Sequence, residues 1–343
     1  MIEVLRLVVR FALLAALCSV ALNPGTALAW GQSGHRMIGQ LLIESLPDEI
    51  PAFLRTPGAR DQIGELSREP DRSKDAGTPH DEDLNPGHYV DISDDQTVFG
   101  LPLSPLPTTR QAYDTALRAH GSNEYKAGYL PFSIVDGWQQ LRKDFAYWRV
   151  DVLGEQSGLA TDADRQWLAR DRNLREMLIV RDLGYWSHFV ADGSQPMHAS
   201  IHYDGWGDYP NPNGYTTQKG LHAYFEGEFV RRYLREEDVK AEIRPYRDCK
   251  CSIQDRTVSY LLATQSQVIP LYELQKRRAF DGANQEGKEF AAQRIAAAVS
   301  ELRDMVIDAW HSSTDATVGY PPVRVRDIES GAVVPIQELK GLD

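Results

Sequence analysis

Apolar residues recur at helical spacing over long stretches of this chain. In the segment 35–46, for example, Ile38, Leu41 and Leu42 fall on one side of a helix that Pro47 would end. Similar patterns predict helices at 134–153, 162–191, 221–234, 252–276 and 288–312. Alternating apolar and polar runs, which are typical of strands, are few. The pattern therefore predicts an all-α fold.

Two segments lack this periodicity. The stretch 67–107 is rich in proline, glycine and aspartate, so we expect a long loop, and long loops in compact domains often carry function. The stretch 320–343 contains three prolines and is expected to form a surface arm or a partly ordered tail. No Gly/Ser-rich or Pro-rich linker and no internal repeat divides the rest. We therefore predict a single compact multi-helix domain at 30–319.

The first 29 residues have the pattern of an export signal. Arg6 and Arg10 introduce the apolar run 11–22, and the A-L-A sequence at 27–29 matches a small-residue cleavage site. The run is too short to span a bilayer comfortably, and no later stretch is long enough, so we expect no transmembrane segment. The predicted mature protein begins at Trp30 and is periplasmic or secreted. The alternative is a retained N-terminal anchor.

Net charge limits the partners that the chain can bind, and the cysteines limit the disulfides that it can form. The full chain has a net charge of −12, and loss of the basic signal leaves it near −13. Such a chain gains little non-specific affinity for nucleic acid, although bound divalent cations would offset the charge locally. Cys18 leaves with the signal, whereas Cys249 and Cys251 remain in D-C-K-C. In an oxidising compartment these two can pair with each other. A metal role is a further alternative, although no histidine lies nearby, and a local structural role is favoured.

Candidate chemistry is densest in the sequence YWSHFVADGSQPMH at 185–198. His188 and Asp192 are four residues apart and share one face of a helix, so both side chains can reach the same atom. Imidazole and carboxylate together are ligands for zinc or another divalent cation. Pro196 ends or kinks the helix and would turn His198 towards a second site. The alternative for such a pair is a solvated helix face.

Further candidate ligands lie before and after this sequence: Trp30 and His35 in WGQSGH, Asp71 in EPDRSKD, His88 in GHYVD, and His222 and Glu226 in GLHAYFEGEF. A terminal amine at Trp30, freed by signal cleavage, can chelate a metal together with its own carbonyl oxygen. His222 and Glu226 are again four residues apart on a predicted helix. Each residue alone also fits an ordinary role, as a helix cap, a turn, an exposed loop residue or a surface pair.

In their order along the chain, these residues resemble the superfamily of zinc-dependent phospholipases C and single-strand-specific nucleases of the S-one/P-one type. The resemblance extends over about 30–310. It depends jointly on the tryptophan that follows cleavage, on the HFVADGSQPMH sequence and on the HxxxE pair. It implies an all-α domain built around a trinuclear zinc cleft.

The resemblance also implies how three zinc ions would be held. The implied ligands are Asp71, His88, His188 and Asp192 for the first ion, the Trp30 amine and carbonyl with His35 and Asp192 for the second, and His198, His222 and Glu226 for the third. Asp192 would bridge the first two ions. The third ion would keep open positions for water, and open zinc sites are typical of catalysis.

The reaction implied by the resemblance is hydrolysis of a phosphate ester by a zinc-activated water. Asp71 would also orient this water, and Arg72 and Lys74 would stabilise charge on the transition state. Tyr89 matches an aromatic position that stacks a base in the nuclease branch. The alternatives are a solvated charge pair for the two basic residues and a core position for Tyr89.

The pattern is mixed between the two branches of the superfamily. WGQSGH resembles the nuclease branch, whereas Glu226 resembles the phospholipase branch. We expect an exported zinc-dependent phosphodiesterase that cleaves single-stranded DNA or RNA, with 3′-nucleotidase activity implied by the resemblance. The alternatives are a phospholipase C that acts on phospholipid head groups and a zinc-stabilised binding domain without turnover.

Overall fold

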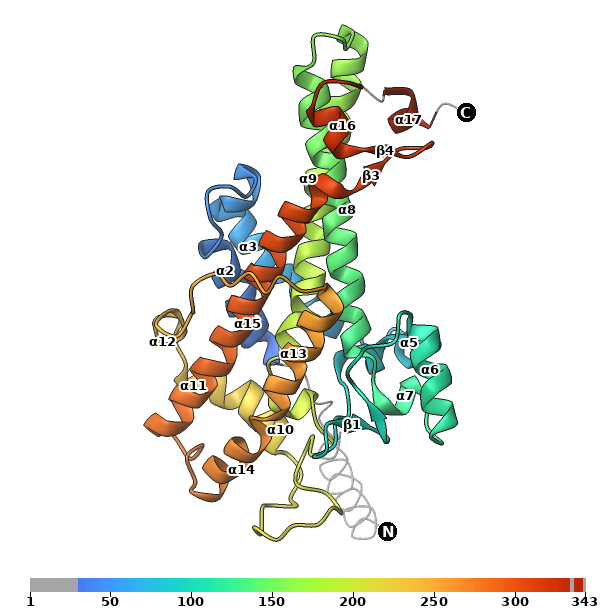
Figure 1. The fold of residues 1–343 in the computed structure, drawn as a ribbon. Coiled ribbons are helices and arrows are strands. Elements are labelled where there is room, and N and C mark those ends of the chain that lie inside the picture. The colour runs from blue at the N-terminus through green and yellow to red at the C-terminus, as the bar shows by residue number, and fades with distance from the viewer. Residues whose placement is uncertain (1–29, 334–335, 342–343) are drawn as a thin grey trace, which may run out of the picture.

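The computed structural model describes residues 30–333 and 336–341 and is shown in Figure 1. It is 64% helical and has, within these residues, only two short two-stranded sheets. The predicted all-α fold is therefore confirmed. The predicted export signal at 1–29 lies outside the described residues.

A long helical hairpin forms the axis of the molecule. Its arms are α8 (Leu130–Gln156) and α9 (Asp162–Asp192), which pack against each other along their length. They approach closely because Gly137 faces Trp186: a Cβ atom at Gly137 would lie 2.1 Å from the indole ring. In Figure 1 the hairpin runs through the centre, and its tip projects beyond most of the other helices.

Both ends of α9 are fixed by local sequence. At its start Thr161 and Asp164 form a capping box, in which each side chain accepts a hydrogen bond from the backbone of the other residue. At its end Asp192 is the last helical residue, followed by Gly193. Pro196 follows and cannot continue the helix. Asp192 therefore stands at the end of a long, well-anchored helix.

The remaining elements surround the hairpin, most of them near its base in Figure 1. Before the hairpin come α2 (Gly31–Glu44), η1 (Ala52–Arg55), α3 (Pro57–Leu66), α4 (Glu69–Arg72), α5 (His80–Leu84), η2 (Asn85–His88), β1 (Thr97–Val98), β2 (Leu101–Pro102), α6 (Arg110–Ala119) and α7 (Glu124–Ala127). After it come η3 (Pro196–His198), α10 (Leu221–Ala223), the π-helix η4 (Tyr224–Phe229), α11 (Val230–Tyr233), α12 (Glu236–Lys240), α13 (Ile253–Gln265), α14 (Val268–Lys276), α15 (Gln285–Ser312), η5 (Ser313–Asp315), β3 (Thr317–Val318), β4 (Val323–Arg324), α16 (Val325–Glu329) and α17 (Ile336–Lys340).

Each of the predicted helical segments contains helix, with two interruptions. The segment 252–276 is divided into α13 and α14, and the segment 221–234 contains the π-helix between α10 and α11. The prediction of a loop over 67–107 was wrong in part, because α4, α5 and η2 lie there. Pro70 and Pro86 explain two of these short helices: proline favours the first turn, where its missing N–H is not needed.

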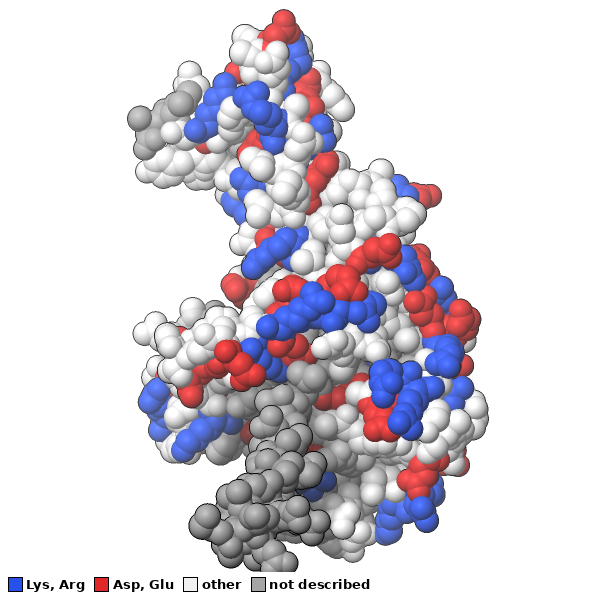
Figure 2. Space-filling view, turned by 180° about the vertical axis from the view of Figure 1, so that it is seen from behind, with Lys and Arg blue, Asp and Glu red and all other residues white. Residues whose placement is uncertain are grey.

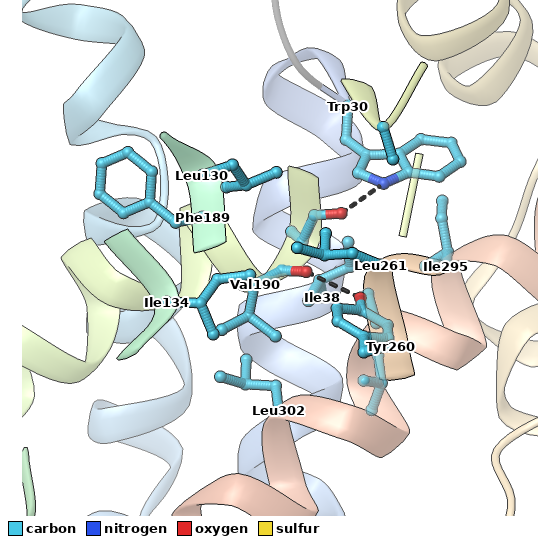
Figure 3. Close-up of a cluster of buried hydrophobic side chains, with 14 of the residues drawn as sticks. Trp30, Ile38, Leu130, Ile134, Phe189, Val190, Tyr260, Leu261, Ile295 and Leu302 are labelled. Atoms are coloured by element: carbon cyan, nitrogen blue, oxygen red, sulfur yellow. Dashed lines mark hydrogen bonds between the residues drawn. The ribbon is translucent and has the colours of Figure 1, made fainter. Parts of the chain in front are cut away.

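The main hydrophobic core lies where α2, α8, α9, α13 and α15 meet (Figure 3). It includes Ile38, Ile134, Val190, Leu261, Ile295 and Leu302, which come from these five helices. Two hydrogen bonds fix the end of α9 within this core. The Trp30 indole donates to the carbonyl of Ala191 at 2.9 Å, and the Tyr260 hydroxyl donates to the carbonyl of Val190 at 2.8 Å.

The C-terminal segment packs against the projecting part of the hairpin. β4 pairs with β3 in an antiparallel ladder, and α16 and α17 follow. Val325 and Ile328 of α16 join Val150 of α8 in a second, smaller cluster of buried residues. Lys340 of α17 forms an ion pair with Asp164 at the start of α9, at 2.8 Å.

An extended segment, 241–252, crosses α15 between α12 and α13. Arg244 in this segment forms an ion pair with Asp304 of α15 at 2.5 Å. Cys249 and Cys251 form a disulfide within the same segment. This pairing is one of the roles that the sequence left open for them.

A buried acidic residue lies between the arms of the hairpin. Asp151 of α8 is 0% exposed, and neither carboxylate oxygen has a hydrogen-bond partner within the described residues. The pKa of Asp151 is raised to about 8, mainly by burial and also by Asp171, while Arg175, which like Asp171 lies on α9, partly opposes the shift. A buried carboxylate without a donor disfavours the charged form.

Replacing Asp151 with asparagine is therefore expected to stabilise the protein, and the gain should grow with pH. The raised pKa in the folded state means that ionisation favours unfolding as the pH rises from about 4 towards about 8. We expect a gain on the order of 1–3 kcal/mol at about pH 8 and almost none at about pH 4. Chemical denaturation at the two pH values measures it. Asp136→Asn, an exposed position on the same helix, is the control, and an equal gain at both pH values would contradict the assignment.

Candidate metal centre

Within the described residues, three groups of histidine and carboxylate side chains have the geometry to hold a metal ion: His35, His188 and Asp192; Asp71, His88 and His188; and His198, His222 and Glu226. In each group the candidate ligand atoms all lie within 4.8 Å of one another. Eight of the nine metal ligands predicted from the sequence belong to these groups. The ninth, Trp30, lies beside them.

Asp192 belongs to the first group and also contacts two histidines of the second. It is completely buried, and its Oδ1 atom lies 3.4 Å from Nε2 of His35. Its Oδ2 atom lies 3.1 Å from Nδ1 of His88 and 3.4 Å from Nε2 of His188. His188 and Asp192 point the same way because they are one helical turn apart. The two carboxylate oxygens thus face different histidines, so this residue can bridge two cations.

The hydrogen bonds of His188 show which of its ring nitrogens can bind a metal ion. Its Nδ1 atom lies 2.9 Å from the carbonyl oxygen of Ser67, an acceptor, so Nδ1 carries the proton. Its Nε2 atom then presents a lone pair, 2.9 Å from Nδ1 of His88 and 3.9 Å from Oδ1 of Asp71. Several electron pairs converge on one small volume, an arrangement that a cation stabilises.

The third group is assembled from three short elements after α9. Oε2 of Glu226 lies 2.8 Å from Nε2 of His222 and 3.7 Å from Nε2 of His198. Nδ1 of His198 lies 2.7 Å from the carbonyl oxygen of His88 and donates to it, so Nε2 faces the carboxylate. This contact also joins the third group directly to a ligand of the second.

Glu226 lies in the π-helix, where hydrogen bonds span five residues and the backbone is wider than in an α-helix. This segment packs tightly on α2. A Cβ atom at Gly31 would lie 3.0 Å from the carbonyl oxygen of Glu226 and 3.0 Å from Cα of Gly227. Glycine at position 31 therefore permits the close approach of α2, which carries His35, to the helix that carries Glu226.

Many ligand atoms of the three groups are buried and lack a hydrogen-bond partner within the described residues. They are both ring nitrogens of His35 and of His222, Nε2 of His198, Oδ2 of Asp71, Oδ1 of Asp192 and Oε1 of Glu226. Each such atom costs about 1–3 kcal/mol if it stays unpaired. Imidazole and carboxylate are the donors that zinc and related divalent ions prefer. The residues present therefore fit bound divalent cations.

Burial also sets the ionisation of the first two groups. It lowers the pKa of His35, His88 and His188 well below the usual value for histidine, so these rings are neutral. Burial raises the pKa of Asp192 well above the usual value for aspartate, and the nearby Asp71 adds to the shift. Neutral imidazoles are the form that binds metal, and a bound cation would favour the ionised form of Asp192.

The third group differs in its electrostatics. Burial raises the pKa of Glu226, but His222 and His198 outweigh it and hold the value at about 2. Burial lowers the pKa of His222, and Glu226 reverses the direction so that the net shift is upwards. Glu226 is therefore ionised and paired with His222. It can ligate a cation once His222 gives up its proton.

The two basic residues singled out with Asp71 lie in different surroundings. Nζ of Lys74 lies 2.5 Å from Oδ1 of Asp71, and its side chain is only 16% exposed. Arg72 turns away and pairs with Glu69 at 2.6 Å and Glu65 at 3.2 Å. Lys74 is thus placed beside the centre, whereas Arg72 belongs to a surface charge network.

Tyr89 lies next to the centre because it follows His88 directly. It is half-buried, and its hydroxyl donates to the carbonyl of Tyr125 at 3.0 Å. Asp91 was not among the predicted site residues. Burial raises the pKa of Tyr89 and Tyr209, and the nearby Asp91 adds to the shift of both phenols. Burial raises the pKa of Asp91 itself to about 7. Aromatic and carboxylate groups therefore meet beside the second group.

Trp30 is held firmly at the start of α2. Its side chain is fully buried, and the indole N–H donates to the Ala191 carbonyl and to the Ser194 hydroxyl, each at 2.9 Å. Its carbonyl oxygen accepts a hydrogen bond from the backbone N–H of His35 at 3.2 Å. Ligation by the Trp30 amine and carbonyl stays a prediction, because it requires cleavage before this residue.

Residues that orient the ligands were also missed. The side-chain carbonyl of Gln195 accepts a hydrogen bond from the N–H of Met197 at 2.7 Å, which turns its amide N–H₂ towards Oε2 of Glu226 at 3.1 Å. The sequence does show a glutamine directly before Pro196, between two predicted ligands, and this could have marked Gln195 as a residue that orients them. The carbonyl of Ser67 left no such signal, since every residue carries one.

Comparison of the chain with protein-family models and with curated proteins gives no match. In the part of the chain that the structure describes, no helix combines the length and the apolar character needed to cross a membrane. The fold and the site define an all-α protein with several buried histidine–carboxylate groups that can hold metal ions.

Divalent metal ions are expected to stabilise the folded protein strongly. Zinc at about 100 times its dissociation constant contributes about 2.7 kcal/mol per site, because it binds the folded state only. Thermal unfolding with chelator and after zinc is returned measures this. In Asp192→Asn the zinc-dependent gain should be smaller, while the metal-free protein should be at least as stable as the metal-free wild type, since a buried carboxyl is removed. An equal zinc-dependent gain in both proteins would contradict the site.

Proposed function

We propose that this protein is an exported phosphodiesterase that hydrolyses single-stranded DNA or RNA and holds three zinc ions in the three groups. The observation that carries the proposal is the sharing of His188 between two groups, with Asp192 between them and the third group bonded to His88. Divalent cations in such an arrangement lower the pKa of a bound water and stabilise the attacking and leaving oxygens of a phosphate ester. The order of the ligands along the chain, which resembles single-strand-specific nucleases, supports the same class.

Residues around the groups support hydrolysis. Oδ2 of Asp71 has no hydrogen-bond partner within the described residues, so it can orient a water molecule or accept its proton. Lys74 places a positive charge beside Asp71, where it would stabilise negative charge that develops on a phosphate. No side-chain nucleophile is required.

Tyr89 supports a nucleic acid substrate over other phosphate esters. It is half-buried beside His88 and can present an aromatic face at the edge of the centre. Stacking of a base on an aromatic ring holds a single strand with little sequence preference. Bases in a duplex are already stacked on each other, so this contact favours single strands.

The charge distribution favours recognition at the centre itself. The chain has a net charge of −12, and on the face shown in Figure 2 the basic side chains lie among acidic ones. General attraction of a polyanion by the protein surface is therefore weak. Affinity for the substrate would come from the metal ions, Lys74 and Tyr89. Contacts at so few points suit a flexible single strand.

Export is part of the proposal because it would complete the first group, that of His35, His188 and Asp192. Cleavage before Trp30 would free an amine close to His35, whose backbone N–H already bonds to the Trp30 carbonyl. The amine and this carbonyl would then supply a nitrogen and an oxygen ligand to the cation, alongside His35 and Asp192.

One residue favours a second candidate function, phospholipase C activity. The carboxylate of the third group is Glu226, which resembles the phospholipase branch of the superfamily. Both aspartate and glutamate ligate zinc, so the difference concerns the substrate and not the metal. Phosphatidylcholine therefore belongs in the activity measurement.

Zinc-loaded protein that begins at Trp30 is expected to hydrolyse single-stranded DNA and RNA but not phosphatidylcholine, and chelator should abolish turnover. Glu226→Gln should reduce kcat by about 100-fold, because an amide binds zinc more weakly than a carboxylate. Glu228→Gln is the control, since this residue lies in the same π-helix but is 44% exposed and pairs with Arg232. Turnover of lipid alone would support the phospholipase, and tightly bound zinc without turnover would support a structural role.

Tyr89→Ala is expected to raise KM for single-stranded DNA by about tenfold with little change in kcat, since stacking contributes about 1–3 kcal/mol. Tyr89→Phe should behave like the wild type, because it keeps the ring and loses only the hydroxyl that bonds to Tyr125. Steady-state kinetics on a short oligonucleotide measure both constants. If the phenylalanine variant lost as much as the alanine variant, the hydroxyl and not the ring would be the important group.

A further inference from the structure

Two segments that carry metal-centre residues run side by side. The first follows His88, and the second follows His198. Nδ1 of His198 donates to the carbonyl of His88 at 2.7 Å, Val90 N–H donates to the carbonyl of His198 at 2.9 Å, and Ile201 N–H donates to the carbonyl of Ile92 at 3.1 Å. These contacts form a ladder between the second and third groups.

The last rung of this ladder is a side-chain contact between His202 and Asp94. Nε2 of His202 lies 3.2 Å from Oδ1 of Asp94, and its Nδ1 lies 2.8 Å from the carbonyl oxygen of Trp206. The imidazole is 0% exposed and stacks on the Trp206 ring with a centroid distance of 3.7 Å. The hydroxyl of Tyr272 donates to the carbonyl of His202 at 2.9 Å. Contacts on both ring edges, on its face and on its backbone thus fix His202.

The loop that begins at His202 returns to the third group. The Trp206 N–H donates to the carbonyl of Thr216 at 2.8 Å, which closes the loop. Oδ1 of Asp204 accepts hydrogen bonds from the N–H of Gly220 at 2.8 Å and from the N–H of His222 at 3.2 Å. The loop therefore caps the segment that carries His222.

This support matters because His222 lies in the first turn of the continuous helical run formed by α10, η4 and α11. The first N–H groups of a helix have no partner within the helix and need acceptors from outside it. The position of His222 must then depend on Asp204, and Asp204 is placed by the loop that His202 anchors. Asp94, in the segment that follows His88, contacts Nε2 of His202.

We propose that Asp94 and His202 are positioning residues for the third metal group, which act by fixing the loop 203–220 and through it the side chain of His222. This inference rests on the metal centre of the proposed function. It does not depend on the identity of the substrate, because the expected effect is on metal affinity. Outer contacts of this kind typically change metal affinity by about 10–100-fold.

The decisive variant is Asp94→Ala. The Asp94 side chain is 61% exposed, so its loss should leave the fold intact. Zinc binding, measured by equilibrium dialysis with metal analysis, should show two ions bound as in the wild type and a third bound about tenfold more weakly. Thermal unfolding of the metal-free protein should not change. Asp94→Asn should restore the third site, because its amide can donate to or accept from Nε2 of His202.

Two further variants make the result specific. Glu49→Ala is the matched control: it breaks another histidine–carboxylate contact, between His311 and Glu49 at 2.9 Å, that lies on the surface away from the centre. It should leave all zinc affinities unchanged. In a Glu226→Gln background, which already lacks the third site, Asp94→Ala should have no additional effect on zinc binding. Tyr272→Phe removes the hydrogen bond to the His202 carbonyl and should also weaken binding of the third ion.

The outcomes separate the inference from the proposed function. Unchanged affinity for the third ion in Asp94→Ala, or equal losses in the alanine and asparagine variants, would overturn the positioning role while hydrolysis by the wild type stood. A wild type that binds three ions without turnover would overturn the proposed activity and leave the positioning role to be decided by the dialysis. A wild type that binds fewer than three ions would overturn the inference directly.

Discussion

The buried carboxylate of Asp192 is the constraint on which the rest of the structure depends. It is removed completely from water, and a buried charge without compensation costs several kcal/mol. Its neighbours within 3.4 Å are imidazole nitrogens of His35, His88 and His188, and burial lowers the pKa of each ring so that none supplies a positive charge. Lys74 opposes the rise in the pKa of Asp192 only in part, so a proton on Asp192 or a bound cation is needed for further compensation. A cation bound here would therefore link the stability of the folded chain to metal binding.

The fold can support this unfavourable arrangement because its helices are held by other contacts. The end of α9 is fixed by the Trp30 indole and the Tyr260 hydroxyl, and α2 approaches the π-helix across Gly31. A large hydrophobic core surrounds these contacts. A small zinc-dependent domain has little core and depends on its metal to fold, whereas this chain has a large hydrophobic core that supports its helices. Burial of that core offsets the cost of bringing the candidate ligands together.

Sequence patterns were sufficient where short-range geometry decides the outcome. The long helices were predicted because their apolar stripes repeat over many turns. The spacing of four residues placed His188 with Asp192 and His222 with Glu226, since that spacing fixes the relative direction of two helical side chains. The meeting of Asp71 and His88 with His188 depends on how distant segments pack, so periodicity could not show it. Only the order of motifs, through the resemblance, suggested that these residues belong together.

Other features could not be predicted because their partners are distant or carry no side-chain signal. His202 had no partner pattern nearby in the sequence, and its partner Asp94 lies 108 residues away. The backbone carbonyls of Ser67 and His88 orient His188 and His198, yet any residue type offers the same acceptor. The short helices of 67–107 likewise depend on contacts with the rest of the fold more than on their own periodicity.

The ladder between the segments after His88 and His198 joins the second group to the third. Backbone hydrogen bonds set its spacing, so the separation of the second and third groups does not depend on flexible side chains. Solvent exposure differs among the candidate ligands: the side chains of His198, His222 and His88 are 7%, 6% and 6% exposed, whereas those of His35 and His188 are 0% exposed. Under the proposed hydrolysis, a phosphate would approach from the side of His88, His198 and His222, with His35 and His188 behind them. A fixed separation of the groups would suit in-line displacement at phosphorus, since the attacking and leaving oxygens must be stabilised at fixed positions.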